Sequence, residues 1–189
     1  IICSACIGGE IPQHILNGRM DKAEESVLWF KNLFGEDYYL EKQRHETHDP
    51  NAAQDVYPHQ VTANKAILEL ARKHNIKVIA TNDVHFVNAE NAEAHDHLIC
   101  LSTGKDLDDP NRMRYTKQEW MKTTAEMNTI FSDIPEALSN TLEIADKVEF
   151  YSIDHGPIMP TFAIPEDFGT EEEYRQKFTE QDLFDEFTR

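Results

Sequence analysis

The stretch 77–86 constrains the fold of this chain most strongly; it reads KVIATNDVHF. It opens as a short apolar run rich in β-branched residues, which is typical of a fully buried strand. Asn82 and Asp83 end the run, because both residue types favour turns over strands. Asp83 and His85 stand two positions apart just past the strand end. Extended backbone there would direct both side chains to the same side, where they can reach one divalent cation.

The neighbours of this stretch favour an α/β fold. A helical pattern covers residues 59–74 before it, and another covers residues 90–101 after it. Polar groups at the carboxyl end of a strand between two helices are the usual layout of an α/β active site, including that of barrels. A purely structural role stays open, since Asp83 can cap the following turn and His85 can be a hydrogen-bonded buried imidazole.

Two further segments share the pattern of a strand that ends in polar or reactive groups. Residues 1–7 are predicted as a buried strand with Cys6 at its end, and residues 38–43 as an aromatic, alternating strand. His45 and His48 follow the second strand and can line the face that carries the central Asp-x-His pair. The alternatives are a small buried apolar role for the cysteine and a solvated loop for the two histidines.

The remaining segments read as helices and a connector. Helical periodicity, and cap residues placed three positions before a Glu, predict five further helices. Their bounds are 11–17, 21–34, 117–121, 125–131 and 134–148. Residues 154–168 carry prolines without any period and read as an extended connector. Residues 171–189 are acidic, with aromatic and leucine side chains at helical intervals, and read as the first helix of a following region.

The charge of the chain limits its partners. Its 35 acidic and 18 basic side chains give a formal net charge of −17. A free-standing nucleic-acid binder needs a basic face for phosphates and is therefore excluded, although the chain can still belong to a larger nucleic-acid enzyme. Three cysteines are an odd and sparse count, which favours a reducing compartment, and we expect the cytoplasm. No apolar run approaches the ~20 residues of a membrane span, so no membrane partner is expected. The chain begins with Ile and lacks a signal-peptide pattern, and we interpret it as a segment of a longer protein.

Several motifs, taken in order along the chain, resemble one known family. They are SACIGGEIP at 4–12, YYLE at 38–41, ATNDVHF at 80–86, AEAHD at 92–96, LDDP at 107–110 and PEALSNTLEIA at 135–145. Together they resemble the PHP domain of the bacterial replicative C-family polymerase, the alpha subunit of DNA polymerase III. The run PTFAIP at 160–165 resembles the connector into the polymerase region of that family. The resemblance extends over essentially the whole chain.

The resemblance implies a partial barrel. PHP domains are distorted (β/α)7 barrels with a metal cluster at the carboxyl ends of the strands. We therefore expect residues 1–115 to form the C-terminal half of a PHP-type α/β barrel and residues 116–150 to form its helical end. Residues 151–189 would be a Pro-rich connector and the start of the polymerase region. A half barrel leaves a strand edge open, so a non-native dimer through that edge is a further expectation.

The resemblance also implies a metal site. On the family pattern Cys6, Asp83 and His85 match metal ligands, and His45 matches a position that lines the site. A thiolate, a carboxylate and an imidazole suit zinc, and the last two also suit manganese or iron. The family's His-x-His motif and its other early ligands have no counterpart in this sequence, so metal binding by the chain alone is expected to be weak or absent. The catalytic carboxylates of the polymerase also have no counterpart, so no catalytic residue is assigned.

The function that the resemblance implies is that of a piece of a replicative DNA polymerase. The parent protein would extend a primer with magnesium ions, while this piece alone would be inactive. The PHP domain would be a scaffold for the polymerase core and a docking site for the proofreading exonuclease subunit, with DNA bound by other domains. An alternative is a metal-dependent PHP phosphoesterase or 3′–5′ exonuclease. A third, a stand-alone interaction module, is disfavoured by the connector that runs into another predicted helix.

Overall fold

The structure is a computed structural model that describes residues 1–160, 169–179, 181, 182 and 185. Contacts divide the chain into a first unit, Ile1–Glu149, and a second unit that begins at Phe150. Within the described ranges, no helix combines the length and the apolar character needed to cross a bilayer.

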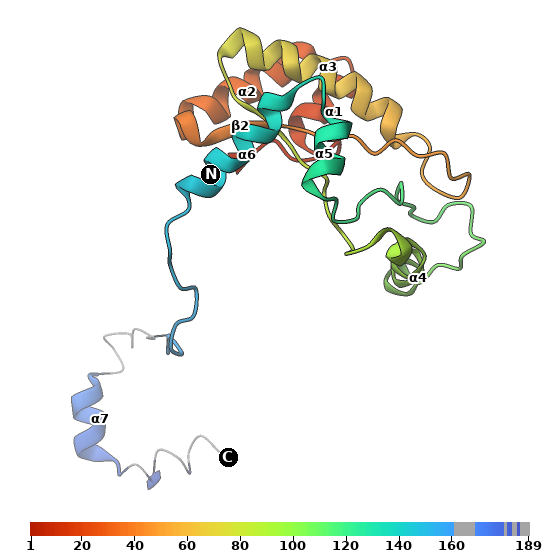
Figure 1. Cartoon of the computed structure of the whole chain (residues 1–189). Coiled ribbons are helices and arrows are strands. Elements are labelled where there is room, and N and C mark those ends of the chain that lie inside the picture. Colours follow the sequence, from red (N-terminus) through yellow and green to blue (C-terminus); the bar gives the residue numbers. More distant parts are fainter. Residues whose placement is uncertain (161–168, 180, 183–184, 186–189) are drawn as a thin grey trace. The chain divides into compact units, whose positions relative to one another are not determined.

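The first unit contains a parallel three-stranded sheet, and its middle strand is labelled among the helices in Figure 1. Its strands are β1 (Ile2–Cys3), β2 (Tyr38–Lys42) and β3 (Val78–Ala80), in the spatial order β1-β2-β3. Parallel neighbours need crossover connections, and helices supply them here, as expected for an α/β fold. The first strand is shorter than the predicted 1–7, because Ala5 adopts a left-handed φ of 63° that ends the extended backbone.

Helices occupy most of the positions that the sequence predicts. They are α1 (Glu10–Leu16), α2 (Met20–Phe34), α3 (Val56–His74), α4 (Ala92–Thr103), α5 (Thr124–Ile130) and α6 (Pro135–Lys147), with short 3₁₀ turns η1 (Gly35–Asp37) and η2 (Ala89–Asn91). The predicted capping box at the start of α5 is confirmed, since Thr123 and Glu126 each bond the other's backbone N–H.

The helix predicted over 117–121 is wrong. Thr116 Oγ1 does donate to Glu119 Oε1 at 2.6 Å, as a capping pair would. Lys117, however, has a φ of 65°, which an α-helix cannot contain. The segment instead runs beside the end of the central stretch, where the backbone N–H of His85 donates to the Glu119 carbonyl oxygen at 2.7 Å. The contact between Thr116 and Glu119 therefore closes a loop rather than starting a helix.

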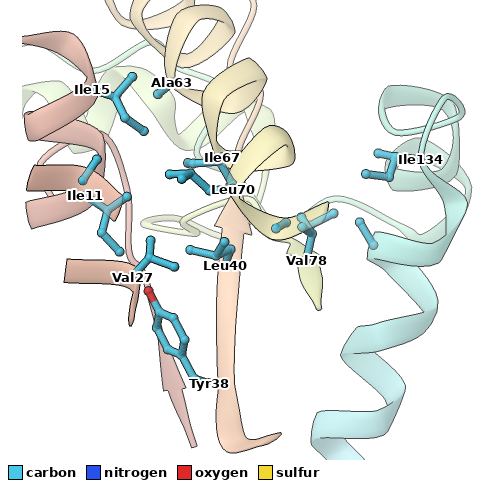
Figure 2. Close-up of a cluster of buried hydrophobic side chains, with 14 of the residues drawn as sticks. Ile11, Ile15, Val27, Tyr38, Leu40, Ala63, Ile67, Leu70, Val78 and Ile134 are labelled. Carbon is cyan, nitrogen blue, oxygen red and sulfur yellow. The ribbon is translucent and has the colours of Figure 1, made fainter. Parts of the chain in front are cut away.

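The hydrophobic core joins the sheet to helices from both halves of the first unit (Figure 2). The side chains labelled there are Ile11, Ile15, Val27, Tyr38, Leu40, Ala63, Ile67, Leu70, Val78 and Ile134. Phe131 belongs to the same cluster, is 0% exposed, and lies with its ring centroid 5.1 Å from the guanidinium carbon of Arg44. The segment that links α5 to α6 thus packs into the same core as α1, α2 and α3.

Helix α6 covers the outer edge of β3. Asn140 Nδ2 donates to the carbonyl oxygen of Val78 at 2.8 Å, in the place where another strand would donate. Glu143 accepts from the Tyr39 hydroxyl at 2.8 Å and from Lys77 Nζ at 2.5 Å. In the described part of the chain β1 pairs only with β2, so the open edge of the sheet lies at β1.

The second unit contains one described helix, α7 (Glu171–Lys177). Residues 151–160 form neither helix nor strand, and their side chains are exposed. The rest of the predicted connector, 161–168, lies outside the described residues, as do the predicted apolar positions Leu183, Phe184 and Phe187.

Candidate functional site

Asp83 and His85 lie together just past the carboxyl end of β3. The His85 Nδ1 atom is 2.6 Å from the backbone carbonyl oxygen of Asp83 and 3.9 Å from Asp83 Oδ1. A carbonyl oxygen only accepts, so Nδ1 carries the proton and donates. The other ring nitrogen, Nε2, therefore carries the lone pair in the neutral ring, which is the form that binds a metal or accepts a proton.

The backbone at Asp83 explains why the two side chains meet. Asp83 adopts a left-handed φ of 46°, which Asp tolerates better than most residues. The sequence predicted that extended backbone would direct both side chains to the same side. That geometry is wrong, because a turn rather than a strand brings Asp83 and His85 together.

Helix α4 and the following loop add two rings to this pair. Three rings are in mutual contact, those of His85, His95 and Tyr115, and we call them the ring cluster. Their centroids are 5.7 Å apart for the two histidines, 4.7 Å for His85 and Tyr115, and 5.1 Å for His95 and Tyr115. Burial, and then the neighbouring His85, lower the pKa of His95, so this ring is neutral near neutral pH. His95, Asp96 and His97 are adjacent on α4, and three consecutive helical residues cannot face one point. His95 faces the cluster, Asp96 pairs with Arg112, and His97 is exposed.

Glu119 is a residue of this region that the sequence analysis did not single out as a candidate. It is 2% exposed, and its Oε1 accepts from the Thr116 backbone N–H and hydroxyl. Its Oε2 is buried without a hydrogen-bond partner among the described residues. A buried carboxylate oxygen left unpaired is costly, so it points to a ligand or to a functional demand. The only signal in the sequence was the Thr-x-x-Glu spacing, which is far commoner at helix starts.

The two remaining candidates are His45 and Cys6. His45 is buried, 3% exposed at its side chain, with Nδ1 3.8 Å from Glu119 Oε1. Cys6 is a free, half-buried thiol that lines a small cavity together with Gln60. His48, by contrast, is exposed.

The pKa of Tyr115 is raised by its surroundings. Burial raises the pKa of the Tyr115 hydroxyl, and the nearby carboxylates of Asp83 and Glu119 raise it further. Cys6 is linked to this region through Gln60, which lines the same small cavity and bonds His45.

The donor groups fit a metal ion in type but fall short in number. A thiol, a carboxylate and imidazoles suit zinc, manganese or iron. Within the part of the chain that the structure describes, however, no three His, Cys, Asp or Glu side chains are grouped so that they could hold a metal ion. Asp83 and His85 are thus two adjacent donors, and a complete site needs further ligands.

Comparison with known proteins gives one consistent result. No family model matches the chain. Its sequence is 41% identical over 186 residues to the DNA polymerase III alpha subunit of Borreliella burgdorferi, which covers 97% of this chain and 15% of that subunit. The alpha subunit of Campylobacter jejuni is 36% identical over 180 residues, covering 89% of this chain and 14% of the subunit. That of Treponema pallidum is 32% identical over 190 residues, covering 99% and 15%. The chain spans about 15% of the length of these relatives.

Proposed function

Because the chain is homologous over nearly its whole length to one segment of the DNA polymerase III alpha subunit, we propose that it is the PHP-type scaffold segment of such a subunit. The observation that carries the proposal is the 41% identity over 97% of the chain. The complete subunit would extend a DNA primer, with magnesium ions aligning the 3′-hydroxyl and the leaving pyrophosphate. Other domains of that subunit would supply the catalytic carboxylates and the DNA contacts.

The scaffold role is supported by the sheet and by the charge of the segment. The parallel strands and the polar residues past their carboxyl ends agree with the C-terminal part of a PHP barrel. The open edge of β1 is where the rest of the subunit would pair, and the same edge would allow a non-native dimer of the isolated chain. A net charge of −17 suits contact with protein, including the proofreading exonuclease subunit, better than contact with DNA. Three free cysteines suit the reducing cytoplasm.

Primer extension tests the scaffold role directly. The complete subunit that contains this segment is expected to incorporate deoxynucleotides with magnesium, and the isolated chain is expected to incorporate none. Leu40 is fully buried in the core, so Leu40→Asp in the complete subunit should lower incorporation at least about tenfold by burying a charge. The control Leu40→Ile keeps volume and polarity and should stay within about twofold. Incorporation by the isolated chain, or an unaffected Leu40→Asp subunit, would overturn the proposal.

A metal-dependent phosphoesterase is the second candidate, and the geometry of Asp83 and His85 favours it. The Asp83 carboxylate and the Nε2 lone pair of the neutral His85 imidazole are both acceptors. The backbone N–H of His85 donates to the Glu119 carbonyl oxygen, and the Glu119 Oε2 atom is unpaired among the described residues. A bound metal ion would supply an activated water and polarise a phosphoryl oxygen, as in a 3′–5′ exonuclease. Cys6 would be a third ligand from this chain, and the others would come from elsewhere in the subunit.

A further inference from the structure

The ring of His45 is held in one defined protonation form by two neighbours. Its Nε2 is 3.0 Å from the carbonyl oxygen of Asn82, which only accepts, so Nε2 carries a proton. Gln60 uses its Oε1 to accept from the His45 backbone N–H at 2.7 Å, which turns its Nε2 toward His45 Nδ1 at 3.0 Å. Nδ1 is therefore the acceptor. Both contacts require the same neutral tautomer, and burial lowers the pKa of the ring in agreement with it.

His45 itself is fixed to helix α3. Gln60 is 2% exposed and bonds both the backbone and the ring of His45. One turn further along α3, Asn64 Nδ2 donates to the carbonyl oxygen of Gln43 at 2.8 Å. The segment after β2 is thus tied to α3 at two points, and the His45 ring projects from it as a rigid donor.

The contact that His45 makes controls the backbone in front of Asp83. The φ angle of Asp83 is the rotation of that residue relative to the Asn82–Asp83 peptide plane, and the Asn82 carbonyl oxygen marks the orientation of that plane. The His45 Nε2–H bond holds this oxygen. On the next peptide, the carbonyl oxygen of Asp83 accepts from His85 Nδ1. Imidazoles therefore fix the peptide planes on both sides of the left-handed residue.

A second set of contacts holds the same turn from the other side. Asn82 Nδ2 donates to the carbonyl oxygens of Gln118 at 2.9 Å and Trp120 at 2.7 Å. A non-glycine residue at positive φ is strained and persists only where its surroundings over-determine it. His45 and the 118–120 segment together supply that constraint.

From these contacts we infer that His45 is a positioning residue for the Asp83–His85 pair: it fixes the Asn82–Asp83 peptide and thereby presents the Asp83 carboxylate and the His85 Nε2 lone pair together. His45 makes no contact with a substrate or metal in this role. The inference deepens the proposed function, since it rests on Asp83 and His85 being the site residues.

The tautomers of the histidines test the inference in the isolated chain, without metal, DNA or a polymerase assay. Long-range ¹H–¹⁵N spectra are expected to show His45 protonated at Nε2 and His85 protonated at Nδ1. In His45→Ala, the His85 ring should lose its single Nδ1–H form, and amide exchange at 83–86 should rise at least about tenfold relative to β2 and α3. His48→Ala, which removes an exposed imidazole three residues away, should change neither reading.

Two further variants keep the test decisive where His45→Ala does not fold. A glutamine can place its Nε2 donor near the position of the His45 Nε2, while an asparagine is too short to reach Asn82. His45→Gln should therefore retain the His85 tautomer and the slow exchange at 83–86, and His45→Asn should lose both. Equal behaviour of the Gln and Asn variants would overturn the inference. So would a folded His45→Ala with unchanged His85, or a rise in exchange spread evenly over the core. Failure of the primer-extension test in the complete subunit would count against the proposed function and would not change the spectra of the isolated chain. Failure of the proposed function and failure of this inference are therefore distinguishable.

Discussion

Replacing Phe131 with alanine is expected to lower the free energy of unfolding by about 3–5 kcal/mol. Phe131 is 0% exposed and lies in the same core cluster as Leu40 and Ile67. The loss combines the transfer of a large ring out of water with the cavity left behind. The Arg44 guanidinium would lose its contact with the ring as well, while its ion pair with Asp133 stays in place. Urea unfolding followed by circular dichroism measures the change, with an unchanged m-value as the sign of a pure stability effect.

The same substitution at an exposed position is the matched control. Phe150 is 103% exposed, so Phe150→Ala should change stability by no more than about 0.5 kcal/mol. If Phe131→Ala unfolds with the wild-type midpoint, the segment between α5 and α6 does not belong to the core of the α/β part. The helical end would then be a separate body.

Replacing Arg112 with alanine is expected to release helix α4. Arg112 makes a bidentate ion pair with Asp96 of α4, with oxygen–nitrogen distances of 2.5 and 2.7 Å, and its Nε donates to the Leu107 carbonyl oxygen. The buried side chains of α4 are Ala92 and Cys100, so the helix depends strongly on this ion pair and on the ring contacts of His95. Removing Arg112 leaves the partly buried Asp96 carboxylate without its charged donor, which costs about 1.5–3 kcal/mol.

Hydrogen exchange measures this local release. Amides of α4 should exchange about 100-fold faster in Arg112→Ala, while those of α3 and β2 keep their rates. The His85–His95 ring contact should be lost with them, since α4 carries His95. Arg114→Ala is the control, because Arg114 makes only hydrogen bonds of 3.3 Å to the backbone of Asp109 and Pro110. Unchanged exchange in α4 would show that other contacts hold it.

Local sequence signals were enough to predict most elements of the first unit. An alternating aromatic pattern marked β2, an apolar run marked β3, and helical periodicity marked the long helices, because burial shapes each of these patterns. The predicted 1–7 strand is shorter than expected and the predicted 117–121 helix is absent, for one shared reason. Ala5 and Lys117 adopt positive φ, which neither residue type announces in a sequence.

The candidate site could be predicted only in part. The spacing of Asp83 and His85 at a strand end marks them as a pair, and the structure places them side by side. His95 and Glu119 join them only because α4 and the 116–121 loop fold back over the strand end, and no local pattern encodes that approach. The tautomer of His85 depends in turn on the left-handed turn at Asp83. Tertiary contacts of this kind lie beyond what spacing can show.

Metal content, measured by elemental analysis, tests most directly the central claim that this chain is one part of a PHP-type site completed elsewhere in an alpha subunit. The account predicts that the isolated chain, after dialysis, retains no stoichiometric metal. The complete subunit that contains it should retain about one or more zinc, manganese or iron ions per molecule and lose them in Asp83→Ala. Asp106→Ala, at an exposed carboxylate of the loop after α4, should retain them. A metal-free complete subunit, or an isolated chain that holds a full metal complement by itself, would contradict the account.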